Sequence, residues 1–132
     1  MVYGKPGTGR QNILTVVRDK LQNGETYNVF ADQVRTPTYV EDLTGAIKKI
    51  IDLKKEGTYH ISGEDVLTPY EMALMVARFF NAHEKLLVPA DRESFKQPAL
   101  RPLKTGFDIT KAKRELGYQP VTFSEGLKKT FY

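Results

Sequence analysis

Two apolar periodicities alternate along the chain, and this alternation limits its fold more than any other feature. An apolar stripe at the spacing of an amphipathic helix predicts a helix over 40–53; its members are Val40, Leu43, Ile47, Ile50 and Ile51. Similar spacing predicts helices over 10–23, 68–81, 109–116 and 124–131. Short apolar runs predict strands at 26–30, 57–62 and 85–90. The expected fold class is therefore α/β, a small mixed domain of helices and short strands.

Several helix ends carry recognisable signals. Thr68 followed by Glu71 forms a capping box, which places the start of a helix at 68. Asn23 before a glycine and Gly117 after an apolar helix are stop signals. Ser124 is the expected cap of the last helix.

Size and composition are those of one globular domain over residues 1–132. The chain has 132 residues with 40% hydrophobic residues, and no apolar run approaches the roughly 20 residues of a membrane span. It contains no cysteine, which excludes disulfides and cysteine metal ligands. We expect a cytoplasmic protein without membrane attachment.

The basic residues are concentrated toward the C-terminus. Residues 1–91 hold 11 Lys and Arg against 12 Asp and Glu, whereas residues 92–132 hold 9 against 4. They are spread over several elements without a nucleic-acid motif, so no nucleic-acid partner is expected. One or two arginines suffice for a phosphorylated small molecule. The polar loop over 91–106 is long for so small a domain and is a candidate ligand loop.

The stretch GKPGTGRQ at residues 4–11 resembles a phosphate-binding loop but lacks its chemistry. Such a loop needs Lys followed by Ser or Thr after its last glycine, and this chain has Arg10 and Gln11 there. Gln11 offers no hydroxyl for a magnesium ion. The stretch is better interpreted as a turn that leads into a helix.

Catalytic and metal-binding residues are not evident. The two histidines lie in unlike settings: His60 in an expected strand, as a hydrogen-bonded structural residue, and His83 after a helix stop, where it should be exposed. Acidic pairs such as Glu41 and Asp42 are adjacent, and adjacent residues do not face each other. We therefore assign no catalytic residue and no metal ligand.

Three segments together resemble a known family: DQVRTPTYVEDL at 32–43, GTYHISGEDVLTPYEMA at 57–73 and ALRPLKTGFDITKAKRELGYQP at 99–120. They are similar to the C-terminal, substrate-binding half of dTDP-4-dehydrorhamnose reductases, which are extended short-chain dehydrogenase/reductases of the nucleotide-sugar branch. The resemblance covers essentially the whole chain. It implies that a Rossmann half is missing and that the chain is a fragment of a longer one.

The resemblance implies a set of substrate-binding residues. In sugar-nucleotide relatives an Arg, a Val five residues on and an Asp two further recur, and Arg35, Val40 and Asp42 keep this spacing. Arg35 and Arg101 would then contact the nucleotide diphosphate, for which a planar guanidinium is suited. A surface turn is the other interpretation of Arg35. Many relatives have Asp at the position of Lys104, which leaves the fine specificity open.

The same likeness places further residues near the substrate. Asn12 and Ile13 would lie near the nucleotide, at a helix N-terminus that attracts anions. Thr36, Pro37 and Thr38 would shape the sugar pocket, although Pro37 and Thr38 could simply begin the next helix.

The catalytic half of such a reductase is not found in these residues. Relatives carry a Tyr-x-x-x-Lys pair and a Gly-rich dinucleotide turn after a core strand. None of the seven tyrosines here is followed by Lys at that spacing. We expect NAD(P)H to be bound by the missing half, no cofactor on this chain, and no activity of the isolated chain. The expected partners are a nucleotide-sugar substrate, the missing N-terminal Rossmann half and a second copy in a homodimer.

Two alternatives stay open. GTYHISGEDVLTPYEMA also resembles the non-catalytic regulatory beta subunit of methionine adenosyltransferase, which binds a partner enzyme. Another nucleotide-sugar epimerase or dehydratase would share the fold. The pairs Asp32-Gln33 and Pro37-Thr38 favour the reductase of dTDP-L-rhamnose biosynthesis.

Overall fold

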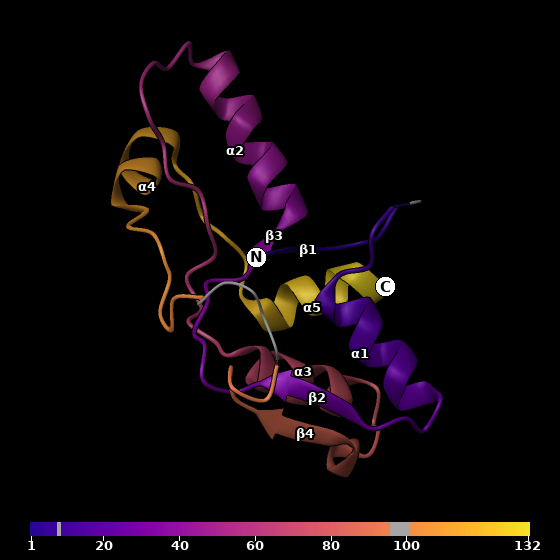
Figure 1. The fold of residues 1–132 in the computed structure, drawn as a ribbon. Helices are drawn as coiled ribbons and strands as arrows, with labels where there is room; N and C mark the ends of the chain where they lie inside the picture. Colours follow the sequence, from indigo (N-terminus) through magenta and orange to yellow (C-terminus); the bar gives the residue numbers. More distant parts are fainter. Residues whose placement is uncertain (8, 96–100) are drawn as a thin grey trace.

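The computed structural model describes residues 1–7, 9–95 and 101–132. Within them helices and short strands are mixed, as the sequence predicts, so the α/β class is confirmed (Figure 1). In chain order the elements are β1 (Val2–Tyr3), α1 (Ile13–Gln22), β2 (Tyr27–Phe30), β3 (Thr38–Tyr39), α2 (Val40–Asp52), α3 (Pro69–Phe79), the 3-10 helix η1 (Glu84–Leu86), β4 (Leu87–Ala90), α4 (Thr110–Leu116) and α5 (Phe123–Phe131).

The strands form two separate parallel pairs. β2 pairs with β4, with Tyr27 opposite Leu87, and β1 pairs with β3, with Val2 opposite Thr38. Helices α1 and α3 pack beside β2 and β4, while α2 follows β3 without a break (Figure 1). The strands β1 and β3 were not predicted, because two residues are too few to show a periodicity.

Side-chain caps set the starts of three helices. Asn12 and Thr15 form a capping box at α1, Thr68 and Glu71 form the predicted capping box of α3, and Thr122 and Glu125 form a third box at α5. The predicted cap Ser124 is therefore wrong by two residues, since Glu125 lies three residues after Thr122 and completes the box there. α4 ends, as predicted, at a left-handed Gly117.

The strand predicted at 57–62 does not form. This segment runs beside α4 and is held by side chains instead of a backbone ladder: the Tyr59 hydroxyl donates to Glu115 Oε2 at 2.6 Å, and Lys111 Nζ donates to the Thr58 carbonyl at 2.9 Å. His60 is exposed, and its ring lies 5.1 Å from that of Phe107, so the expected strand position of His60 is wrong as well.

Two hydrophobic clusters stabilise the fold. The larger one joins α1, α3, α5 and the β2–β4 pair around fully buried side chains such as Leu14, Met72 and Phe123. The smaller one joins α2 to α4 through Ala46, Ala112 and neighbouring side chains. In Figure 1, α5 lies between the α2–α4 part and the part that contains α1, α3, β2 and β4.

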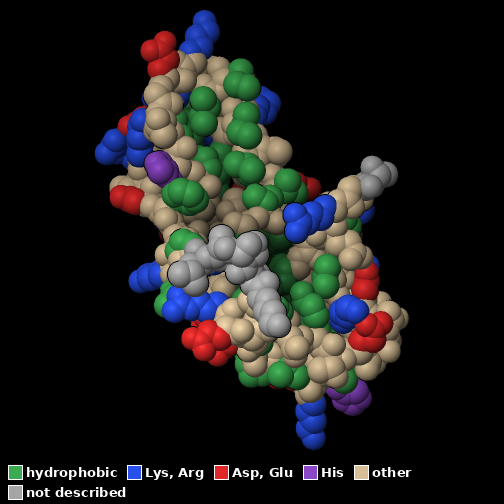
Figure 2. All heavy atoms as spheres, in the orientation of Figure 1, with side chains coloured by type: hydrophobic (Ala, Val, Ile, Leu, Met, Phe, Trp, Pro, Cys, Tyr) green, Lys and Arg blue, Asp and Glu red, His purple; other side chains and the backbone are tan. Residues whose placement is uncertain are grey.

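One face of α2 is apolar and open. Ile47 is 47% exposed and Ile51 is 68% exposed, although both belong to the apolar stripe that predicted the helix. Figure 2 shows hydrophobic side chains gathered over α2 on the face in view. No helix in the described part of the chain is long and apolar enough to cross a membrane.

Candidate functional site

A pocket of about 360 Å³ lies between the start of α1, strand β2 and the segment at 33–35. We call it the arginine pocket, because Arg10, Arg35 and Arg101 are among its lining residues. Arg35 and Arg101, the two residues predicted to hold a diphosphate, thus line one cavity although they are far apart in sequence. No Asp or Glu stands among the described residues that line it, so its polar groups favour an anion.

Backbone hydrogen bonds on both sides hold the segment that carries Arg35. The Arg35 N–H donates to the Leu67 carbonyl, and the Leu67 N–H donates back, both at 2.9 Å. The Val34 N–H donates to the Leu103 carbonyl at 2.6 Å, and the Thr105 N–H donates to the Val34 carbonyl at 3.1 Å. The backbone under the guanidinium is therefore fixed by two loops that are distant in sequence.

The Arg35 guanidinium is itself oriented by its neighbours. Arg35 Nη1 donates to the Val34 carbonyl at 2.8 Å, and Nη2 donates to Gln33 Oε1 at 2.5 Å. A guanidinium has five donor hydrogens, so most of them are left for a ligand. Arg35 is half-buried, whereas Arg101 is exposed. Arg35 is therefore a preorganised donor and Arg101 an accessible one.

The start of α1 closes another side of the arginine pocket. Asn12 and Ile13 line it, as their predicted place near the nucleotide requires. The Asn12 side chain, however, accepts from the N–H groups of Leu14 at 3.0 Å and Thr15 at 3.3 Å, and its own amide donates to the Gly4 carbonyl at 2.8 Å. These helix N–H groups already have an acceptor, so the arginines are the better anion donors here.

Apolar and aromatic side chains line the remaining wall. Tyr27, Phe30 and Phe95 belong to it, and the rings of Phe30 and Phe95 lie with centroids 4.1 Å apart. Ile13 and Val16 add aliphatic surface from α1. The arginine pocket therefore combines cationic donors with an aromatic wall. Cationic donors suit a diphosphate, and aromatic rings suit a flat base, so the pocket is complementary to both parts of a nucleoside diphosphate.

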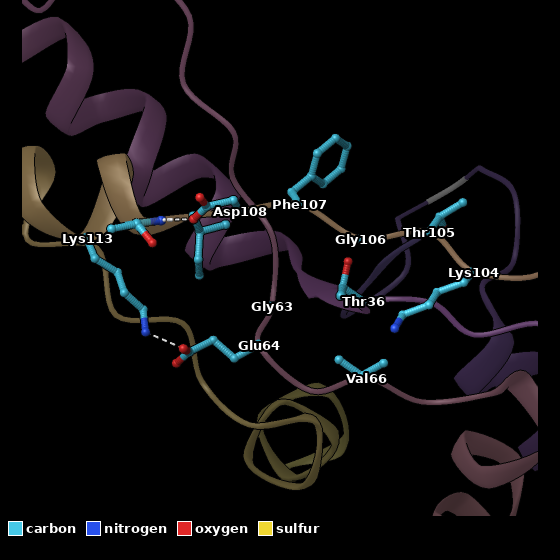
Figure 3. A pocket seen from close by; sticks show the side chains of 12 residues that line it. Thr36, Gly63, Glu64, Val66, Lys104, Thr105, Gly106, Phe107, Asp108 and Lys113 are labelled. Atoms are coloured by element: carbon cyan, nitrogen blue, oxygen red, sulfur yellow. Dashed lines mark hydrogen bonds and ion pairs between the residues drawn. The ribbon is translucent and has the colours of Figure 1, made fainter.

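Thr36, Pro37 and Thr38 do not line the arginine pocket. Thr36 lines a second cavity of about 590 Å³ together with Gly63, Lys104 and Phe107 (Figure 3). Pro37 and Thr38 are buried, and the Thr38 hydroxyl accepts from the Gly63 N–H at 3.3 Å. Thr38 begins β3, so the helix start considered for this pair follows one strand later.

The second cavity is lined by paired charges. Figure 3 shows Lys113 and Glu64 facing each other as an ion pair, and Asp108 accepting from the Thr110 N–H, which it does at 2.8 Å. Hydrogen bonds donated by Thr110 lower the pKa of the Asp108 carboxyl. These charges are largely neutralised by each other, so this cavity favours an anion less than the arginine pocket does.

Asp42, the third residue of the recurring Arg, Val and Asp pattern, has a structural role. Its Oδ2 atom accepts from the Val121 N–H at 2.9 Å, which fastens α2 to the segment before α5. It lines neither the arginine pocket nor the second cavity.

Sequence reasoning missed Gln33 and the aromatic wall. Gln33 is 2% exposed, lines the arginine pocket and holds Arg35, but was noted only as part of a resemblance. Tyr27 and Phe30 were seen only as strand residues. An aromatic at each end of a four-residue strand is the one signal that could have marked them.

Comparison with known proteins adds the family context. The family model described as RmlD substrate binding domain matches residues 1–132. The dTDP-4-dehydrorhamnose reductase of Bacillus anthracis, solved in complex with NADP, is 31% identical with a TM-score of 0.86, over 98% of this chain and 45% of that one. A reductase of the same name from Clostridium acetobutylicum is 26% identical with a TM-score of 0.84, over 98% and 45%.

A regulatory relative is about equally similar in sequence. The methionine adenosyltransferase 2 subunit beta of Mus musculus is 30% identical over the whole chain and 41% of its own length. The chain thus spans less than half the length of the relatives that it matches.

Proposed function

Because the chain belongs to the family of RmlD substrate binding domains, we propose that it binds a nucleotide sugar through the arginine pocket. The diphosphate would lie against Arg35 and Arg101, and the base against Phe30 and Phe95. The observation that carries the proposal is the joint presence of these two arginines and an aromatic wall in one cavity without a described carboxylate.

We propose further that the domain serves the NAD(P)H-dependent reduction of a 4-keto nucleotide sugar in dTDP-L-rhamnose biosynthesis. Its support is the likeness to the reductase of Bacillus anthracis, which was solved with NADP. The domain would contribute position: held by its diphosphate, the sugar presents its keto carbon to the hydride donor, so that binding energy is converted into orientation.

The described residues of this chain do not fit the dinucleotide itself. A dinucleotide site needs a Gly-rich turn between a core strand and a helix whose first N–H groups are free. Here the strand before the turn is the two-residue β1, and Asn12 occupies the N–H groups of Leu14 and Thr15 at the start of α1. The cofactor and the proton donor are therefore assigned to the proposed Rossmann half.

Substitution of Arg101 tests the proposal. In the natural polypeptide that carries these residues, Arg101→Ala is expected to weaken binding of dTDP roughly tenfold or more, since a charge-assisted hydrogen bond contributes about 1.5–3 kcal/mol. Arg78→Ala removes the same charge from an exposed ion pair with Glu84 and should leave binding unchanged. Calorimetry that finds equal dTDP affinity for wild type and Arg101→Ala would remove the diphosphate role.

A regulatory protein is the second candidate, supported by the 30% identity to the methionine adenosyltransferase subunit. The two candidates differ in what the natural polypeptide does. Turnover of a 4-keto dTDP sugar with NAD(P)H supports the reductase. A stable complex with a methionine adenosyltransferase from the same cells, without such turnover, supports the regulatory protein.

A further inference from the structure

Gln33 has a buried amide that the contacts within the described residues leave half satisfied. The side chain is 2% exposed and lines the arginine pocket. Its Oε1 atom accepts from Arg35 Nη2 at 2.5 Å. Its Nε2 atom is buried and has no hydrogen-bond acceptor among the described residues. Buried amide groups are normally paired, because an unmade hydrogen bond costs stability.

The orientation of this amide follows from its neighbour. An arginine side chain can only donate hydrogen bonds, so the group that faces Arg35 must be the amide oxygen and not the amide nitrogen. Rotation of the amide by half a turn would bring two donors together. The nitrogen of Gln33 therefore faces away from Arg35, and both of its hydrogens are donors without a described partner.

The surroundings select the chemistry of the missing acceptor. The Arg35 guanidinium is hydrogen-bonded to the Gln33 side chain, and Arg10 and Arg101 line the same cavity. No lining residue among those described is acidic. A cavity with donors on several sides and no described acidic side chain favours an oxygen that carries negative charge and no proton. A phosphate oxygen fits this requirement.

We propose that Gln33 contacts the ligand and positions Arg35 at the same time. Its Nε2 donates to an oxygen of the diphosphate, while its Oε1 holds the guanidinium that contacts the same group. This inference rests on the proposed function, because it takes the diphosphate to lie in the arginine pocket. It adds a neutral donor to the two arginines and makes the phosphates the part of the ligand that Gln33 recognises.

Two ligands that differ only in their phosphates separate this role from a structural one. Binding of dTDP and of thymidine to the natural polypeptide is measured by calorimetry. Gln33→Met removes the donor and the acceptor in a side chain of similar size. We expect it to weaken dTDP binding roughly ten- to hundredfold, with thymidine binding changed less than about threefold. A structural role would lower both affinities by the same factor.

A second variant of Gln33 and a control variant complete the experiment. Gln33→Glu keeps the size of the side chain and an acceptor for Arg35, so it should fold, and its negative charge should weaken dTDP binding more than Met does. Gln22→Met is the control, because Gln22 is exposed at the end of α1 and is not among the residues that line the arginine pocket. It should bind both ligands like the wild type.

The outcomes separate the two proposals. If the wild type binds dTDP no tighter than thymidine, the proposed function fails and this inference fails with it. If Arg101→Ala loses dTDP affinity but Gln33→Met and Gln33→Glu lose none, or lose dTDP and thymidine equally, only the role of Gln33 is overturned. A loss confined to dTDP in both Gln33 variants supports it.

Discussion

Replacement of Gly63 by alanine is expected to destabilise the fold strongly. A Cβ atom built at Gly63 would lie 2.0 Å from the carbonyl oxygen of Pro37, and real Cβ atoms essentially never come within 3.0 Å of a heavy atom beyond their own chain neighbours. The obstacle is backbone, not the end of a flexible side chain. The two segments must therefore separate by about 1 Å or more to accept a methyl group.

The structure sets the size of the effect. Overpacking of this kind costs typically about 1–3 kcal/mol. The separation also breaks the hydrogen bond from the Gly63 N–H to the Thr38 hydroxyl, 3.3 Å long, which contributes about 1 kcal/mol. We expect Gly63→Ala to lower the free energy of unfolding by roughly 3 kcal/mol. With a urea dependence of about 1.5 kcal/mol per M, the unfolding midpoint falls by about 2 M.

Gly45→Ala is the matched control. Gly45 lies inside α2, and a Cβ atom there would meet nothing within 4 Å. An exposed glycine within a helix is less stable than alanine by about 0.5–1 kcal/mol, so this variant should unfold at a higher urea concentration. Both changes affect the unfolded chain alike, so their difference reports the native contact. Equal midpoints by circular dichroism would refute the close approach of Gly63 to Pro37.

Two other predictions concern side-chain contacts next to α2 and α4. Burial raises the pKa of Tyr118 to about 12, so the unfolded chain loses this proton first and the free energy of unfolding should fall from about pH 10 to pH 12. In urea titrations over this pH range, the free energy of unfolding of Tyr118→Phe should decline less steeply than that of the wild type. Asp42→Ala leaves the Val121 N–H without its acceptor and should lower the free energy of unfolding by about 2 kcal/mol. Asp52 is the exposed ion-pair partner of Lys48 on the same helix, so Asp52→Ala should lower it by less than about 1 kcal/mol. Equal costs would contradict the role given to Asp42.

Local signals account for the parts of the fold that the sequence predicted. The capping box of Thr68 and Glu71 marked α3, and the apolar spacing marked α1 and α2. These features depend on residues three or four positions apart, which a sequence displays directly. The same rule could have found the box at α5, because Glu125 follows Thr122 by three residues and therefore marks Thr122, not Ser124, as the cap.

Errors occurred where distant residues decide. The segment at 57–62 has the composition of a strand, yet the side chains of Lys111 and Glu115 hold it instead of a neighbouring strand. The stripe on α2 predicted a helix correctly but not which part of it is covered, and Ile51 is 68% exposed. Burial depends on the packing partner, and a helical pattern does not identify that partner.

The distinction between local sequence signals and contacts of distant residues also applies to the candidate site. Arg35 and Arg101 were selected by resemblance, and the structure adds that they share a cavity with Gln33. In an extended segment, alternate side chains point to opposite sides. Gln33 and Arg35 accordingly face the arginine pocket, whereas Thr36 lines the second cavity, although it was grouped with the sugar pocket.

The backbone bonds of Val34 and Arg35 explain why this alternation is fixed. Both N–H groups and both carbonyls of these two residues are used, by Leu67 on one side and by Leu103 and Thr105 on the other. A shift by one residue would break this ladder and move the Arg35 side chain into the second cavity. The direction of the guanidinium is therefore set by residues far along the chain, which no local pattern around Arg35 could have revealed.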